Sequence, residues 1–116
     1  NCELTDFLVL PNGRHIERLE ESQETSNYVT YLSLDEIKLP LFVRTCRPGD
    51  KMTIKNMEGH KKVSDIFTDE KIELSERRSW PVVVDSDNEI IWLPGLKKSH
   101  FDRKNSGKYD IILKYY

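Results

Sequence analysis

The sequence is poor in cysteine and histidine and has no long apolar run. Two cysteines, Cys2 and Cys46, lie far apart in a chain of 116 residues. A chain of this length does not need a disulfide to fold, so we expect both thiols to be reduced, as in a cytoplasmic protein. No apolar stretch approaches the roughly 18 residues that a membrane helix requires. We therefore expect neither a membrane span nor a membrane partner.

Patterns that catalyse reactions or hold metals are also missing. The three histidines are His15, His60 and His100. None has a cysteine or a second histidine at ligand spacing, so no metal site is expected. No glycine-rich phosphate loop, Ser-His-Asp order or Cys-His arrangement can be assembled. Asp65, Asp69 and Glu73 could line one helix face, but solvated helix acids are far commoner than catalytic ones. We expect no catalytic residues.

Charge is unevenly distributed along the chain. The 18 basic and 20 acidic residues give a net charge of −2, which argues against a general nucleic-acid binder. Residues 1–40 hold three of the basic and eight of the acidic residues, whereas residues 41–116 hold fifteen and twelve. The sign therefore changes near Pro40, which points weakly to a polyanionic partner on one face, while two ordinary solvated faces would explain it equally well.

Alternation and turn residues predict a chain of mostly β-strands. Strands are expected over residues 6–10, 15–20, 28–32, 41–46, 81–85, 89–93 and 109–116. Pro11-Asn12-Gly13 and Ser86-Asp87-Asn88 favour tight turns and so predict two hairpins. Ser64 is predicted to cap a helix over 65–71, and Ser75 a second helix over 76–79. One α+β domain over residues 1–116 follows, with an acidic β-rich lead-in over 1–40.

Basic side chains gather at the turns and helices of residues 41–116. They are Arg44, Arg47 and Lys51 around the Pro48-Gly49 turn, Lys61 and Lys62 before the first helix, and Arg77 and Arg78 in the second. Arginine can fork two hydrogen bonds onto a phosphate, and lysine acts as a point charge. The unpaired amides of a helix that starts after Lys62 would add donors. If these groups lie on one face, they could contact the phosphate backbone of a double-stranded RNA. The alternative is that they are ordinary surface charges.

Several motifs together resemble one family. The run LFVRTCRPGDKM over residues 41–52 resembles the Arg-x-x-Arg-Pro-Gly-Asp-Arg segment of tRNA(Ile)-lysidine synthetase C-terminal domains. GHKKVSDIF over 59–67 is similar to the family's Gly-x-Lys-Lys-x-x-Asp-Phe-Phe. Lys71-Ile72, Arg77 or Arg78, Trp80-Pro81 and IWLPGL over 91–96 follow in the family's order. The resemblance covers residues 41–103.

This resemblance implies a function that composition does not show. The family's enzyme is an ATP-dependent ligase that attaches lysine to the wobble cytidine of tRNA(Ile) and so forms lysidine. Its catalytic domain carries a Ser-Gly-Gly-x-Asp-Ser loop, which this sequence lacks. ATP and magnesium therefore belong to another domain, and this chain needs no cofactor. Since Asn1 is not a translation start, we expect an inactive C-terminal piece of a longer enzyme.

The family's C-terminal domain holds the tRNA acceptor stem, and its fold is implied to be a β-sandwich-like α+β domain akin to one in phenylalanyl-tRNA synthetase β subunits. Matching positions imply these tRNA contacts: Arg44, Arg47, Lys51, Lys61, Lys62, Lys71, Arg77 and Arg78. The catalytic domain of the same chain is a further expected partner, and a homodimer stays open. The alternative is a protein-interaction or dimerisation module with an apolar patch of Trp92, Phe101, Tyr115 and Tyr116. Trp80 and Trp92, however, are expected to be core residues and not stacking platforms.

Overall fold

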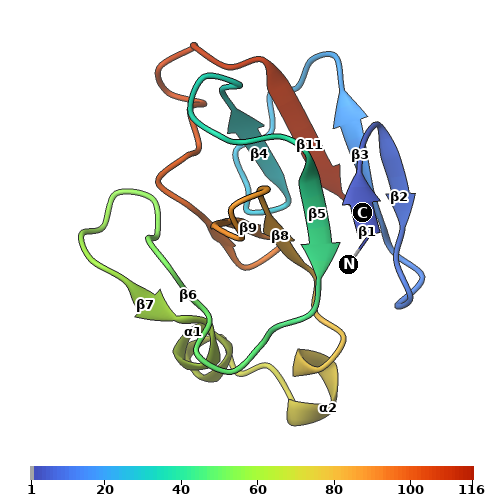
Figure 1. Ribbon diagram of the computed structural model, residues 1–116, viewed down its shortest axis with the longest axis vertical. Helices are drawn as coiled ribbons and strands as arrows, with labels where there is room; N and C mark the ends of the chain where they lie inside the picture. The colour runs from blue at the N-terminus through green and yellow to red at the C-terminus, as the bar shows by residue number, and fades with distance from the viewer. Residues whose placement is uncertain (1) are drawn as a thin grey trace.

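The computed structural model describes residues 2–116 as two stacked β-sheets with two short helices at one end (Figure 1). The five-stranded sheet consists, in spatial order, of β1 (Cys2–Leu4), β5 (Leu41–Arg44), β8 (Val82–Val84), β9 (Ile90–Leu93) and β10 (Lys97–Lys98). The four-stranded sheet consists of β2 (Phe7–Val9), β3 (His15–Leu19), β11 (Ile111–Tyr115) and β4 (Val29–Leu32). A separate ribbon of β6 (Lys51–Met52) and β7 (Lys61–Lys62) leads into α1 (Val63–Asp69), which α2 (Leu74–Arg77) follows.

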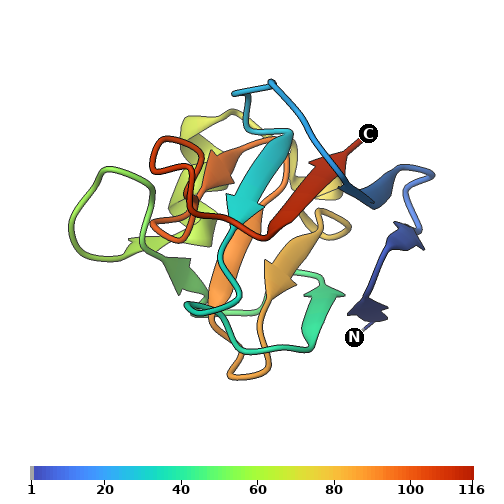
Figure 2. The ribbon, with the colours of Figure 1, turned by 90° about the horizontal axis from the view of Figure 1, so that it is seen from above.

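The main core lies between the two sheets. Val43 and Ile91 of the five-stranded sheet meet Ile16, Ile111 and Leu113 of the four-stranded one in a single buried cluster. Figure 2, seen from above, shows β4 and β11 lying over β8 and β9. Every pairing between these strands is antiparallel. The α+β, sandwich-like architecture expected from the sequence is therefore confirmed.

A second core covers the other face of the five-stranded sheet. Val82 and Val84 pack there against Ile66 and Phe67 of α1 and against Met52 of β6. Because the sheet is buried on both faces, its central strands are continuously apolar and do not alternate. This packing fixes the ribbon and both helices against the ends of β5 and β8, where the predicted basic residues cluster.

Both predicted hairpins are confirmed. Phe7 pairs with Glu17 across the first, and Val83 pairs with Trp92 across the second. Gly13 has a φ of 85°, a conformation that glycine adopts without strain. The strands near residues 28–32, 41–46 and 109–116 are also present as β4, β5 and β11.

The predicted helix caps are wrong. α1 starts at Val63 with Lys62 at its N-cap, and no side chain caps it. The strand β7 runs directly into this helix, so the Val63 amide donates to the Asp50 carbonyl at 2.9 Å and the Ser64 hydroxyl is not needed. α2 likewise starts before Ser75, with Glu73 at its N-cap and no side-chain cap.

The structure bears on two alternatives that the sequence left open. Of the apolar patch expected for an interaction module, Trp92 and Tyr115 are buried in the main core and Phe101 packs against it, so Tyr116 alone of the four is exposed. α1 ends at Asp69, which leaves Glu73 outside the helix and removes the shared carboxylate face. Within residues 2–116, no helix is long and apolar enough to cross a membrane.

Candidate nucleic-acid interface

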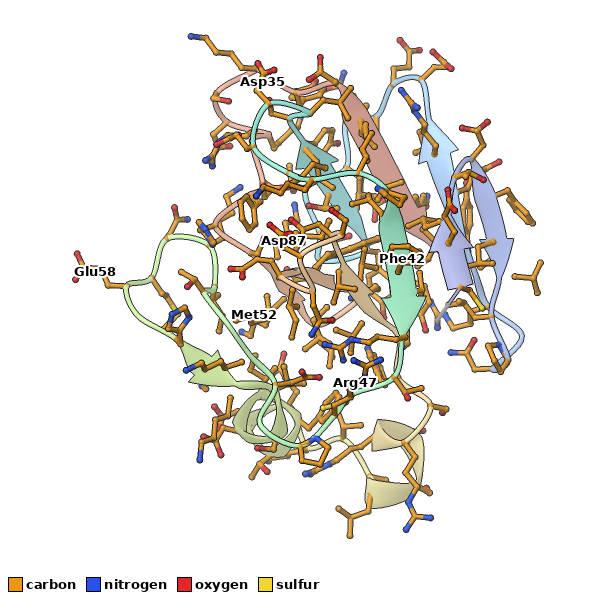
Figure 3. All side chains as sticks on the ribbon, viewed as in Figure 1. Asp35, Phe42, Arg47, Met52, Glu58 and Asp87 are labelled. Carbon is orange, nitrogen blue, oxygen red and sulfur yellow. The ribbon has the colours of Figure 1, made fainter. Side chains whose placement is uncertain are left out.

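The predicted site begins in the turn that follows β5. The Asp50 amide donates to the Arg47 carbonyl at 3.1 Å, which closes the turn. The Asp50 carboxylate accepts the Arg47 amide at 2.7 Å. Gly49 has a φ of 85°, so a side chain at this position would be strained. The turn is therefore closed by two hydrogen bonds, and the exposed Arg47 is its first residue (Figure 3).

Arg44 lies beneath this turn and holds it in place. Its guanidinium forms a two-point ion pair with the Asp50 carboxylate, at 2.7 and 3.0 Å. The same group donates to the Asn88 side chain at 3.1 Å and to the Thr45 carbonyl at 3.0 Å. Only 3% of the Arg44 side chain is exposed, so its donors are directed into the domain. Arg44 therefore acts in this structure as a positioning residue for the turn that carries Arg47.

The pKa of Asp50 reflects this arrangement. Burial raises that pKa, but the hydrogen bonds from Arg44 and from the Arg47 amide outweigh burial and hold it below its usual range. The carboxylate is thus ionised at neutral pH and its charge is compensated by Arg44. It does not act as a free negative charge on the surface beside Arg47.

A hollow of about 350 Å³ lies between this turn, the end of β7 and the two helices. We call it the basic hollow, and its walls include Arg47, Lys62, Ser64, Phe67, Arg77 and Arg78. Asp50, its one acidic lining residue among those described, is already paired with Arg44. Four cations around one concave surface create a positive potential that attracts an anion.

Arg77 and Arg78 occupy different positions in the wall of the basic hollow. Arg77 is anchored, because its Nε donates to the Ile72 carbonyl at 2.7 Å and its guanidinium lies 5.9 Å from the centre of the Phe67 ring. Arg78 follows α2 and is exposed. The sequence could not choose between these two arginines, and the structure places both of them at the hollow.

The remaining predicted residues divide between two sides of the ribbon. Lys51 pairs directly with Lys62 across β6 and β7, so the two side chains lie on the same face and Lys51 extends the basic surface. Lys61 points the other way and forms an ion pair with Asp69, and the hydrogen bond that it donates to this carboxylate raises the pKa of Lys61. Lys71 is exposed beyond the end of α1 with a φ of 57° and does not line the hollow.

The structure thus brings Arg47, Lys62, Arg77 and Arg78 together with Lys51 beside them, and it does not bring in Lys61 or Lys71. The first amide of α1 is not free for a phosphate, because it already donates to the Asp50 carbonyl. Sequence reasoning missed the role of Asn88, which we interpreted only as a turn residue. Its φ of 63° and its position in the β8–β9 turn bring its side-chain oxygen Oδ1 to the guanidinium of Arg44.

Comparison with known proteins identifies the family. The family model for the TilS substrate C-terminal domain matches residues 41–112. Curated relatives include the tRNA(Ile)-lysidine synthase of Bacillus subtilis strain 168, which is 47% identical over 81% of this chain and 21% of its own length. The enzyme of the same name from Geobacillus kaustophilus is 41% identical over 95% of this chain and 25% of its own length. The chain thus spans about a fifth to a quarter of the length of these relatives.

Solved structures agree with this assignment. The crystal structure of a TilS C-terminal domain superposes with a TM-score of 0.84 at 39% identity, over 94% of this chain and 88% of that one. An N-terminal fragment of the phenylalanyl-tRNA synthetase β subunit from Pyrococcus horikoshii has a TM-score of 0.59 at 17% identity over 75% of this chain and 27% of that one, which shows a shared fold alone. The family-model match and the identities of the relatives show that this chain belongs to the TilS substrate C-terminal domain family.

Proposed function

We propose that this domain is the tRNA(Ile)-binding part of a cytoplasmic ligase. The ligase uses ATP to attach lysine to the wobble cytidine and so forms lysidine. Relatives that carry the name tRNA(Ile)-lysidine synthase support the parent activity. The domain itself contributes binding without catalysis, and ATP and magnesium bind to the catalytic domain. The proposed contact is the double-stranded acceptor stem, recognised through its phosphates.

The convergence of Arg47, Lys62, Arg77 and Arg78 on one hollow carries this proposal. These residues come from three separate segments, and only the fold places them together. Arginine forks match phosphate oxygens in a two-point geometry, and backbone contacts of this kind position an RNA without reading its sequence. Lys51 continues the positive surface along the ribbon, so this surface can contact the phosphates of an RNA stem at more than one position.

The net charge of −2 does not conflict with RNA binding at this end of the molecule. Glu20, Glu21 and Glu24 belong to the loop between β3 and β4, which leaves β3 at the end of the molecule opposite the two helices (Figure 1). Exposed charges separated by more than about 10 Å are largely screened at an ionic strength of 0.1 M. An RNA at the basic hollow is therefore little affected by these three carboxylates, and the acids nearer to it are those of the helices, such as Asp65 and Glu76.

A salt titration with matched variants tests the proposal. The 116-residue chain is titrated with tRNA(Ile) at several salt concentrations, and the slope of log affinity against log salt is measured. The double change Lys62→Glu and Arg78→Glu is expected to weaken binding and to make the slope shallower by about 2, near 0.9 for each lost phosphate contact. The control is Lys104→Glu with Lys108→Glu, which changes the net charge equally in the loop at the opposite end of the molecule.

The outcomes separate a specific face from general attraction. A shallower slope in the first variant with an unchanged slope in the control supports binding at the basic hollow. Equal effects of the two variants would contradict it, because attraction would then depend only on total charge. An unmodified chain that fails to bind tRNA at low salt would contradict RNA binding by this domain.

A further inference from the structure

A second hollow lies directly beside the basic one. Its volume is about 360 Å³, and it lies between the β2–β3 turn, the end of β5 and the segment that follows α2. We call it the apolar hollow, because Val9, Leu10, Pro11, Val43 and Pro81 line it. Leu10, Val43 and Pro81 are buried and form its floor. Arg47 and Arg78 are exposed and line both hollows, so they stand between the two.

The lining of the apolar hollow suits a nucleobase. Apolar walls with a few polar groups are typical of small-molecule sites, and a volume near the lower end of the usual range of roughly 300–1,000 Å³ admits one base with its sugar. Thr45 and Ser79 place exposed hydroxyls beside it, which can bond to base edges. Guanidinium planes such as those of Arg47 and Arg78 stack on unpaired bases in RNA complexes.

The charge around the apolar hollow also suits a nucleotide. Among the described residues that line it, arginines supply charge and no side chain is acidic. Another hollow on the surface, at the end of β1 and the cis Leu39-Pro40 bond, is lined by Glu3, Asp6 and Arg18, so its acids outnumber its one cation and it suits a phosphate less well. The two arginines can therefore hold a phosphate while the attached base enters the apolar hollow.

We propose that the apolar hollow takes one unpaired nucleotide from the single-stranded 3′ end of the bound tRNA. This inference rests on the proposed binding of the tRNA stem in the basic hollow. A base within the stem would have to be unpaired and unstacked at a cost of about a few kcal/mol. The 3′ tail is already single-stranded, and it would continue a strand of a stem whose phosphates the arginines contact. Recognition by stacking and apolar contact tolerates different bases, so the presence of the tail matters more than its sequence.

The test combines a shortened RNA with a matched pair of variants. The dissociation constant of the 116-residue chain is measured for intact tRNA(Ile) and for the same tRNA without its 3′ single-stranded nucleotides. Val9 is 62% exposed, so Val9→Asp adds a charge at the apolar hollow without disturbing the core. Phe7→Asp is the control, because Phe7 is 51% exposed on the same face of β2 and does not line the hollow.

Removal of the tail is expected to weaken binding by the native chain about tenfold, which is the scale of one stacked base. V9D should weaken binding of the intact tRNA by a similar factor and leave binding of the shortened tRNA unchanged. F7D should bind both RNAs as the native chain does. The urea midpoint of each variant, followed by the fluorescence of the buried Trp92, verifies that the fold is retained.

The possible failures are distinguishable. Equal affinity of the native chain for the two RNAs would overturn the proposed nucleotide site while leaving stem binding intact, provided that the salt slope persists. A V9D variant that loses the same factor for both RNAs would also overturn it, because its effect would not depend on the tail. If the native chain bound neither RNA, both the stem-binding proposal and this inference would be wrong.

Discussion

The buried ion pair between Arg44 and Asp50 makes a quantitative prediction about stability. The Arg44 side chain is 3% exposed and the Asp50 side chain 10% exposed, and they meet through two hydrogen bonds. Removal of one partner leaves the other charge buried without compensation, which costs about 3–5 kcal/mol. We expect a loss in this range for Arg44→Met and for Asp50→Asn. For a chain of this size, it corresponds to a fall in Tm of about 12–20 °C.

The double variant distinguishes pair formation from simple loss of packing. With both charges removed, no buried charge is left unpaired, and the amide side chain introduced by Asp50→Asn still offers an oxygen to the Arg47 backbone amide. The double variant should therefore cost less than the sum of the single variants, by about 1–3 kcal/mol. Urea unfolding monitored by tryptophan fluorescence measures all three values, since Trp92 is buried and Trp80 partly so.

An exposed ion pair in the same molecule provides the control. Lys38 and Asp87 lie 2.8 Å apart, with 71% and 59% of their side chains exposed. Solvent screens such a pair, so Lys38→Met should leave the urea midpoint essentially unchanged. Additive effects of Arg44→Met and Asp50→Asn, or single effects no larger than that of Lys38→Met, would refute the reasoning.

Three further predictions address the lysine pair, acid stability and a strained position. Lys62→Glu should weaken tRNA binding more than Lys61→Glu, because Lys62 lines the basic hollow and Lys61 is paired with Asp69. Equal tRNA affinities of the two variants would contradict this placement. Burial raises the pKa of Asp102, but the hydrogen bonds that its carboxylate accepts, first of all from Lys55, outweigh burial and hold this pKa below its usual range. The stability that Asp102 contributes is therefore present above about pH 4 and is lost as pH falls through the pKa of the folded state. Asp102→Asn should accordingly lower Tm at pH 7 and lose less Tm between pH 5 and pH 3 than the native chain, and a parallel decline would speak against it. Gly95→Ala should cost about 1–3 kcal/mol in urea unfolding, because φ is 79° and the added carbon would lie 3.3 Å from the Tyr28 ring; an unchanged midpoint would show that the backbone relaxes.

Local patterns in the sequence predicted the local elements well. The Asn12-Gly13 pair and the 86–88 turn each gave a hairpin, because turn geometry depends on the residues of the turn itself. Strand β1 escaped prediction, since residues 2–4 show no distinctive alternation and pair with β5, about forty positions away. Helix caps failed for a related reason: the start of α1 is set by pairing of the ribbon before it.

The candidate site was predictable in composition but not in arrangement. Motif positions picked out Arg47, Lys62, Arg77 and Arg78, which do share a hollow. Nothing in the sequence indicated that Arg44, only three residues before Arg47, would be directed into the domain. The sheet is covered on both faces, so the end of β5 carries Arg44 into the domain, where its partners Asp50 and Asn88 come from a turn and a distant hairpin. Which basic residue faces solvent is thus decided by the packing of distant segments.

The interleaving of the two sheets affects where this domain can be cut. The segment matched by the family model, residues 41–112, supplies β5, β8, β9 and β10 but only the first part of β11. The other three strands of the four-stranded sheet, and β1 at the edge of its partner, come from the acidic lead-in. A protein expressed with those family bounds would expose Val43, Val83 and Ile91 to water and would be prone to aggregate. For expression and for domain grafting, a transferable piece therefore has to include the strands of the acidic lead-in and all of β11, even though the most recognisable sequence begins at residue 41.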